Sequence, residues 1–303
     1  MELIRRLDST NAHDCVVTIG GFDGIHLGHR ALIERMRAHG RRLKLPSMLV
    51  SFEPLPREVL FPDDPPERLT NFRERWRLLA DTGLERLCLL TFSQRLRRIP
   101  GVEFMNWLQL ARARVVVIGH DFRFGAGGEA NAQWCAGQSA AFGFDVDVVD
   151  AVPLDGMRIS SRRVREALRF GYLSEAKRLL GRPYGMRGRV RRGNQLGRTL
   201  GFPTANLAVK RRRVAMTGVF AVRVHGEGLN GWPGVASLGT RPVIDGTHML
   251  LEAHLFDFAG DLYGREVEVE FVARLRDELK FASLDDMVQQ MHRDAEQARR
   301  QLG

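Results

Sequence analysis

The chain has 303 residues, of which 44% are hydrophobic and 27% charged, and a formal net charge of +10 at pH 7. This length favours two domains over one, and because no run of about eighteen apolar residues occurs, the sequence predicts no membrane-spanning helix. The three cysteines have no paired spacing, which argues against a disulfide scaffold or a cysteine-based zinc site and predicts a cytoplasmic protein.

The first half of the chain alternates apolar segments with amphipathic ones. We expect strands at 15–21, 47–52, 86–92, 114–119 and 144–152, and helices at 29–43, 70–84, 101–113 and, as two short helices, 160–181. Continuous apolar strands alternating with helices predict a doubly wound α/β fold, whose parallel sheet is covered on both faces. Ligands of such folds bind beyond the carboxyl ends of the strands, where the loops 20–24, 52–54 and 119–125 fall.

Near residue 183 the pattern changes to short strands separated by Gly and Pro turns. This pattern predicts a small antiparallel barrel or sandwich, and of the two we expect the β-barrel. The strand segments are 186–193, 218–226, 231–239, 249–258 and 266–275. A C-terminal helix should begin at Ser283, which forms a capping box with Asp286. Its apolar stripe should comprise Leu284, Met287, Met291 and Ala295. The domains are therefore expected at 1–183 and 184–303.

A glycine-rich turn, "GGFDGIHLGH", directly follows the first apolar strand segment. Gly20, Gly21 and Gly24 allow a tight turn and a close approach of the backbone to a ligand. The following helix offers free N–H groups and the positive end of its dipole, which together form an anion site. His26 and His29 are three residues apart, and two imidazoles there suit a phosphate whose charge rises during a reaction. The alternative is a capped helix with surface histidines.

The whole string resembles the H-x-G-H signature of the nucleotidylyltransferase superfamily, in which the histidines stabilise an α-phosphate. "ISSRRVRE" at 159–166 resembles the I-S-S-T-x-x-R motif of the same superfamily, which closes over the phosphates of ATP. Alone, its serines would be read as helix caps and its arginine as a solvated residue. The resemblance implies catalytic roles for His26, His29 and Arg165. It implies nucleotide binding by Gly20, Phe22, Asp23, Gly24, Ser160 and Ser161.

The second half carries "GRTLGFPTANL" at 197–207, which resembles the P-T-A-N motif of riboflavin kinases; 234–246, 251–264 and 269–281 resemble further blocks of these enzymes. Nearly the full chain resembles the bacterial bifunctional riboflavin kinase/FAD synthetase family. The resemblance implies that Thr204 and Asn206 hold the Mg²⁺ that accompanies ATP, and that Glu252 is the general base. It implies nucleotide binding by Gly197 and Arg198, and flavin binding by Asp121, Phe122, Arg123, Phe124 and Arg241.

Four departures from the family pattern fall in the adenylylation half. Gly21 stands where the family commonly has Asn, Gly128 and Asn131 where Arg and Asp are frequent, and Arg162 where the motif has Thr. They keep open one alternative, a riboflavin kinase whose adenylyltransferase domain is weak or inactive.

The resemblance implies that riboflavin, FMN, FAD and ATP are the partners, with no nucleic acid and no membrane. The positive net charge suits nucleotides, but it suits nucleic acid as well. A basic nucleic-acid-binding protein is therefore the remote alternative. The run "KRRR" at 210–213 is expected to be a solvated face. The sequence leaves the oligomeric state, the relative rates and the redox preference for the flavin open.

Overall fold

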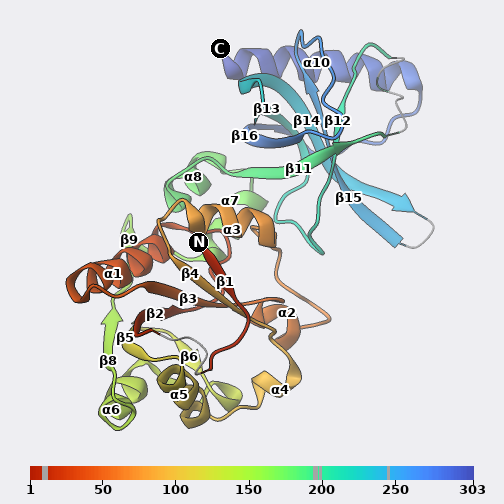
Figure 1. Cartoon of the computed structure of the whole chain (residues 1–303). Coiled ribbons are helices and arrows are strands. Elements are labelled where there is room, and N and C mark those ends of the chain that lie inside the picture. Colours follow the sequence, from red (N-terminus) through yellow and green to blue (C-terminus); the bar gives the residue numbers. More distant parts are fainter. Residues whose placement is uncertain (9–12, 194–196, 198–199, 244–245) are drawn as a thin grey trace. The chain divides into compact units, whose positions relative to one another are not determined.

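The computed structural model describes the chain except for residues 9–12, 194–196, 198–199 and 244–245, and it describes only the backbone of the remaining residues between 241 and 248. The chain forms two compact units (Figure 1). The first unit comprises Met1–Pro66 and Arg75–Ser160, and the second comprises Glu67–Glu74 and Ser161–Gly303. The second unit thus also includes residues 161–183, and the functional division at residue 183 stays a prediction.

The first unit is built on a six-stranded parallel sheet with the order β1-β4-β3-β2-β5-β8. All five strands predicted for this half are present, which confirms the parallel sheet, whereas the three-residue β1 was not predicted. Every residue of β2 and β3 is buried, because both faces of the sheet are covered. The strands are β1 (Glu2–Ile4), β2 (Cys15–Ile19), β3 (Ser47–Phe52), β4 (Arg86–Leu90), β5 (Ala113–Gly119) and β8 (Asp145–Val149).

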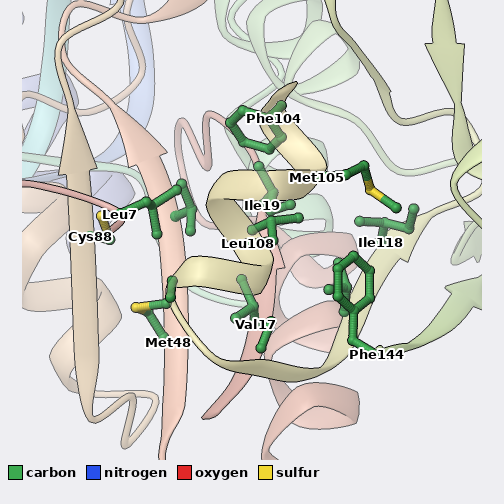
Figure 2. Packing of buried hydrophobic residues seen from close by; sticks show 14 of the residues in the cluster. Leu7, Val17, Ile19, Met48, Cys88, Phe104, Met105, Leu108, Ile118 and Phe144 are labelled. Atoms are coloured by element: carbon green, nitrogen blue, oxygen red, sulfur yellow. The ribbon is translucent and has the colours of Figure 1, made fainter. Parts of the chain in front are cut away.

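Helices pack on both faces of this sheet. Figure 2 shows Phe104, Met105 and Leu108 of α5 beside Val17 and Ile118 of the sheet, while α1 also packs on β2 and β5. The helices are α1 (Leu27–Leu43), α2 (Pro56–Leu60), α3 (Phe72–Ala80), α4 (Gln94–Arg97), α5 (Gly101–Leu110) and α6 (Ala132–Phe142). Two small hairpins pair β6 (Arg123–Phe124) with β7 (Ala130–Asn131) and β9 (Pro153–Leu154) with β10 (Met157–Arg158). The sheet therefore presents its loops from a rigid core.

The second unit contains a closed antiparallel barrel with the order β11-β12-β15-β14-β13-β16, which confirms the predicted barrel. The two short helices α7 (Ser161–Arg169) and α8 (Leu173–Leu180) precede it, as predicted. Strand β12 lies inside the P-T-A-N motif and was not predicted. The strands are β11 (Gly185–Arg191), β12 (Ala205–Ala208), β13 (Gly218–Gly226), β14 (Leu229–Val243), β15 (Gly246–Leu255) and β16 (Glu266–Arg276).

The C-terminal helix α10 (Leu284–Leu302) begins as predicted. Its N-cap Ser283 accepts a hydrogen bond from the Asp286 backbone N–H at 3.1 Å. The expected apolar stripe was wrong at its first member, because Leu284 is 51% exposed. The buried side of the helix instead ends in Ala298 and Leu302, which pack on the barrel.

Candidate active sites

The turn between β2 and α1 has a strained backbone. Phe22 and Ile25 have φ values of 49° and 44°, in a region that side-chain-bearing residues rarely adopt. Both side chains are buried, and a Cβ on Gly20 would lie 2.9 Å from the Phe22 ring. Strain of this kind persists only where the surroundings over-determine it, and it concentrates at functional sites.

The two histidines of this turn lie together. The His26 and His29 rings stack at 3.6 Å between centroids, with an interplanar angle of 16°. His26 is the N-cap of α1 rather than part of its first turn, and its Nδ1 accepts a hydrogen bond from the His29 backbone N–H at 3.2 Å. A neutral His26 therefore carries its proton on Nε2. His26 therefore caps the helix, but it is buried and is not a surface histidine. The role of the two imidazoles toward a phosphate stays a prediction.

Arg75 braces the same turn and was missed by the sequence analysis. Its guanidinium, only 2% exposed, donates hydrogen bonds to the carbonyls of Gly21 at 2.9 Å and Phe52 at 3.0 Å. It also donates to the Glu53 carboxylate at 2.8 Å. These contacts tie together the loops that follow β2 and β3. Nothing in the sequence distinguishes Arg75 from its solvated neighbours on α3.

The second motif runs from the first unit into the second. A Cβ on Gly28 would lie 3.6 Å from the Ile159 carbonyl oxygen, so the motif begins beside the start of α1. Ser160 is the last residue of the first unit, and Ser161 is the first residue of α7 in the second. Within the second unit, Arg165 Nε donates to the Glu67 carbonyl at 2.5 Å.

The predicted flavin loop follows β5. Phe122 and Phe124 stack at 5.4 Å and pack against the core, including aromatic residues of α5 and α6. Asp121 and Arg123 are exposed, and Asp121 accepts a hydrogen bond from Arg158 at 2.5 Å. The two aromatic residues anchor the loop, and the two charged residues face solvent.

Three of the four residues that depart from the family pattern have a local structural explanation. Gly128 has a φ of 75°, which favours glycine. Asn131 is the N-cap of α6 and accepts a hydrogen bond from the Trp134 backbone N–H at 2.8 Å. Arg162 is 82% exposed and pairs with Glu166 one turn later.

In the second unit, three neighbouring strands align the predicted kinase residues. Asn206 of β12 lies directly opposite Glu252 of β15, which lies opposite Ser237 of β14. Directly paired residues of antiparallel strands share one face of the sheet. Thr204 just precedes β12, and its hydroxyl accepts a hydrogen bond from Asn206 Nδ2 at 3.3 Å. The fold therefore brings Thr204, Asn206 and Glu252 together and adds Ser237, which was not predicted.

Asn206 has a buried oxygen atom that suits a cation. The residue is 7% exposed, and no donor among the described residues reaches its Oδ1. A buried acceptor without a donor costs about 1–3 kcal/mol, a cost that a bound cation would remove. Among the described residues, no group of three or more His, Cys, Asp or Glu could hold a metal. A metal here would therefore take further oxygen ligands from its substrate.

A pocket of about 260 Å³ adjoins this row, lined by Thr204, Ser237 and Glu252. Its apolar lining includes Leu200, Phe202, Leu279, Phe281, Met287 and Met291. One wall is fixed by an ion pair between Arg276 of β16 and the buried Asp294 of α10 at 2.7 Å. Burial raises the pKa of Glu278 in this wall, and nearby Arg276 opposes the shift.

Two predicted residues of this half cannot be placed by their side chains. Arg198 lies outside the described residues, and Arg241 is described only by its backbone, which pairs with His248. Gly197 is described, and its carbonyl accepts hydrogen bonds from the backbone N–H groups of Leu200 and Phe202 at 3.2 and 2.7 Å. Gly197 therefore lies at the edge of the pocket, which it lines.

Comparison with known proteins covers both units. The FAD synthetase family model matches residues 8–163, and the riboflavin kinase family model matches residues 180–302. Proteins named bifunctional riboflavin kinase/FMN adenylyltransferase from Escherichia coli K12 and Pseudomonas fluorescens are 42% and 41% identical to this chain. The alignments cover 100% and 99% of this chain, and 98% and 97% of those relatives.

The fold also matches a crystal structure named macrolide-efflux protein from Streptococcus pneumoniae, with a TM-score of 0.84 and 34% identity over 99% of both chains. Across the part of our chain that the structure describes, no helix is long and apolar enough to cross a membrane. Both family models and the full-length relatives agree, and this chain belongs to the bifunctional riboflavin kinase/FMN adenylyltransferase family.

Proposed function

We propose that residues 184–303 phosphorylate riboflavin to FMN, and that residues 1–183 adenylylate FMN to FAD and pyrophosphate, with ATP as the donor in both reactions. The observation that carries this proposal is that one chain holds both residue sets, the stacked histidines in the first unit and the Asn206–Glu252 row in the second. A kinase with an inactive adenylyltransferase domain is not favoured, since both family models match.

For the kinase, Thr204 Oγ1 and Asn206 Oδ1 would hold Mg²⁺, and the buried oxygen of Asn206 supports this assignment. Bound Mg²⁺ would neutralise charge on the ATP phosphates. Glu252 orients the ribityl 5′-hydroxyl and takes its proton while the oxygen bonds to the γ-phosphorus and ADP leaves. The apolar part of the pocket accepts the flat flavin ring. Gly197, which lines this pocket, contributes to nucleotide binding. The roles of Arg198 in nucleotide binding and of Arg241 in flavin binding are carried over from the family resemblance alone.

For adenylylation, a phosphate oxygen of FMN attacks the α-phosphorus of ATP and pyrophosphate leaves. The His26 Nε2 proton and the His29 side chain stabilise the charge that grows on the α-phosphate. The backbone N–H groups at the start of α1 bind phosphate oxygens. By family membership, the nucleotide contacts further include Gly20, Phe22, Asp23, Gly24, Ser160, Ser161 and Arg165. The flavin contacts include Asp121, Phe122, Arg123 and Phe124.

We place the enzyme in the cytoplasm, with its flavins and ATP as ligands and with no nucleic-acid or membrane partner. The three cysteines support this location, since all are buried and none is bridged. Unbridged thiols are typical of a reducing compartment.

The experiment is incubation of the full chain with riboflavin, ATP and Mg²⁺, followed by chromatographic separation of the flavins. We expect FMN to form first and FAD to follow, and neither to form when a chelator removes Mg²⁺. FMN alone would support the kinase-only alternative. Neither product, together with salt-sensitive retention on DNA, would support the nucleic-acid-binding alternative.

A further inference from the structure

A basic pocket in the second unit is assigned to neither proposed reaction, although one of its residues, Arg191, lies directly opposite Asn206 in the pairing of β11 with β12. It has a volume of about 530 Å³ and shares no lining residue with the kinase pocket. Its lining includes six cationic side chains, Arg68, Arg73, Arg187, Arg189, Arg191 and Lys210, against the two carboxylates of Glu74 and Glu266. This excess of positive charge within one pocket favours an anionic ligand.

The strand pattern explains how the cations come together. Arg187, Arg189 and Arg191 alternate along β11 with residues that include the buried Val190, so the three arginines share one face. At about 3.3 Å per residue, this row extends over roughly 13 Å. Lys210 follows β12, the neighbour of β11. The run "KRRR" is thus not a simple solvated face, because Arg211 is buried and paired with Glu74.

Four of these cations form no ion pair with a described residue. Within the described part of the chain, Arg73, Arg189, Arg191 and Lys210 form no ion pair, and all four are exposed. Arg189 lies directly opposite Glu266 of β16 without forming an ion pair with it, whereas Arg187 pairs with Glu268 at 2.7 Å. The four cations without an ion pair leave the pocket with an excess of positive charge, which favours an anion.

The other wall of the pocket comes from the segment Glu67–Glu74, which includes the first turn of α3. Asn71 caps this turn, accepting from the Glu74 backbone N–H at 3.1 Å. The positive end of the helix dipole adds to the potential of the pocket. We propose that this pocket binds a di- or triphosphate group, either as an inorganic polyphosphate or as the phosphate tail of a nucleotide. A row of this length and a volume in the range of small-ligand sites suit several linked phosphates better than one.

The lysine content of the chain allows a direct test on the full-length protein. Lys44, Lys177, Lys210 and Lys280 are its only lysines, and all are exposed. Acylation of each is followed by mass spectrometry with and without inorganic tripolyphosphate at low ionic strength. We expect tripolyphosphate to slow acylation at Lys210 alone. Lys44 is the sharpest internal control, since it lines a cleft whose Arg37 and Arg41 both pair with Glu34.

A matched pair of variants completes the test, with melting curves to check folding. Arg189→Ala should raise the tripolyphosphate concentration for half-protection of Lys210 about two- to fivefold, the usual effect of one exposed charge. Arg300→Ala, which removes an exposed arginine of α10, should leave that concentration unchanged. Equal half-protection by ATP and tripolyphosphate would identify the phosphates alone as the ligand, and tighter protection by ATP would identify a nucleotide.

Three results would overturn the proposal. They are no protection of Lys210, equal protection of all four lysines, and the same half-protection in Arg189→Ala as in the wild type. Protection by an oligonucleotide where tripolyphosphate gives none would overturn it as well.

Discussion

Replacing Gly193 by Ala should impair the kinase without unfolding the chain. A Cβ at this residue would lie 2.7 Å from Oδ1, 2.8 Å from Cγ and 2.9 Å from Nδ2 of Asn206. An ordinary contact needs about 3.4 Å, so the carboxamide must move by roughly 0.7 Å, and a 1 Å misplacement at a reacting centre can cost about 10²-fold in rate. We expect FMN formation to fall about ten- to hundredfold and its half-saturating Mg²⁺ concentration to rise.

The assay is FMN formation from riboflavin at a series of Mg²⁺ concentrations, alongside FAD formation from supplied FMN, which should not change. Gly137→Ala is the matched control, because a Cβ on this helical residue meets nothing within 4 Å. Unchanged kinase kinetics in Gly193→Ala, at an unchanged melting temperature, would refute the assignment of Asn206 as a metal ligand.

Three further predictions concern the first unit. Burial alone would raise the pKa of Asp147, but hydrogen bonds from Arg35 and His39 outweigh burial and hold it below its ordinary 3.8. Asp147 therefore stabilises the fold above that value, and this contribution is lost as the pH falls through the lowered pKa. In urea unfolding, Asp147→Asn should lower the free energy of unfolding by about 1 kcal/mol at pH 7 and by less at pH 3. Burial raises the pKa of Cys15 and Cys88 to about 12, so at pH 8 their thiolate fraction is ~10⁻⁴ and a thiol reagent should label them only after unfolding. The Gly21→Asn variant should fold, because a Cβ at this residue would lie 3.5 Å from Leu55, an ordinary contact. Its amide should add one hydrogen bond of about 1 kcal/mol and so raise the rate of FAD formation from FMN about fivefold. A fall in that rate would contradict the prediction.

The sequence predicted the architecture wherever burial leaves a direct pattern. A central parallel strand is apolar throughout, so the predicted strand 47–52 coincides with β3. Strand β12 has only four residues, and its partner β15 is distant in the sequence. The local sequence pattern therefore does not predict β12. Helix α6 was also missed, because its many small residues form no clear apolar stripe.

The sites were predicted unevenly for similar reasons. Motifs identified the histidines and the P-T-A-N residues, but placing Ser237 beside Glu252 requires the strand register, which turn geometry sets. Arg75 and Asp294 are charged side chains buried by tertiary hydrogen bonds and an ion pair. Residue type alone predicts both to be exposed.

The central claim is that one chain carries two independent active sites, and the measurement that tests it most directly compares both activities in two variants. Glu252→Gln should lower FMN formation by roughly two orders of magnitude and keep FAD formation from supplied FMN. His29→Ala should lower FAD formation by about 10²–10³ and leave FMN formation unchanged. The second variant removes the ring that stacks on His26 but keeps the hydrogen bond of the helix cap, because the His29 backbone N–H donates that bond. Loss of both activities in either variant, or FAD formation largely retained in His29→Ala, would contradict the account.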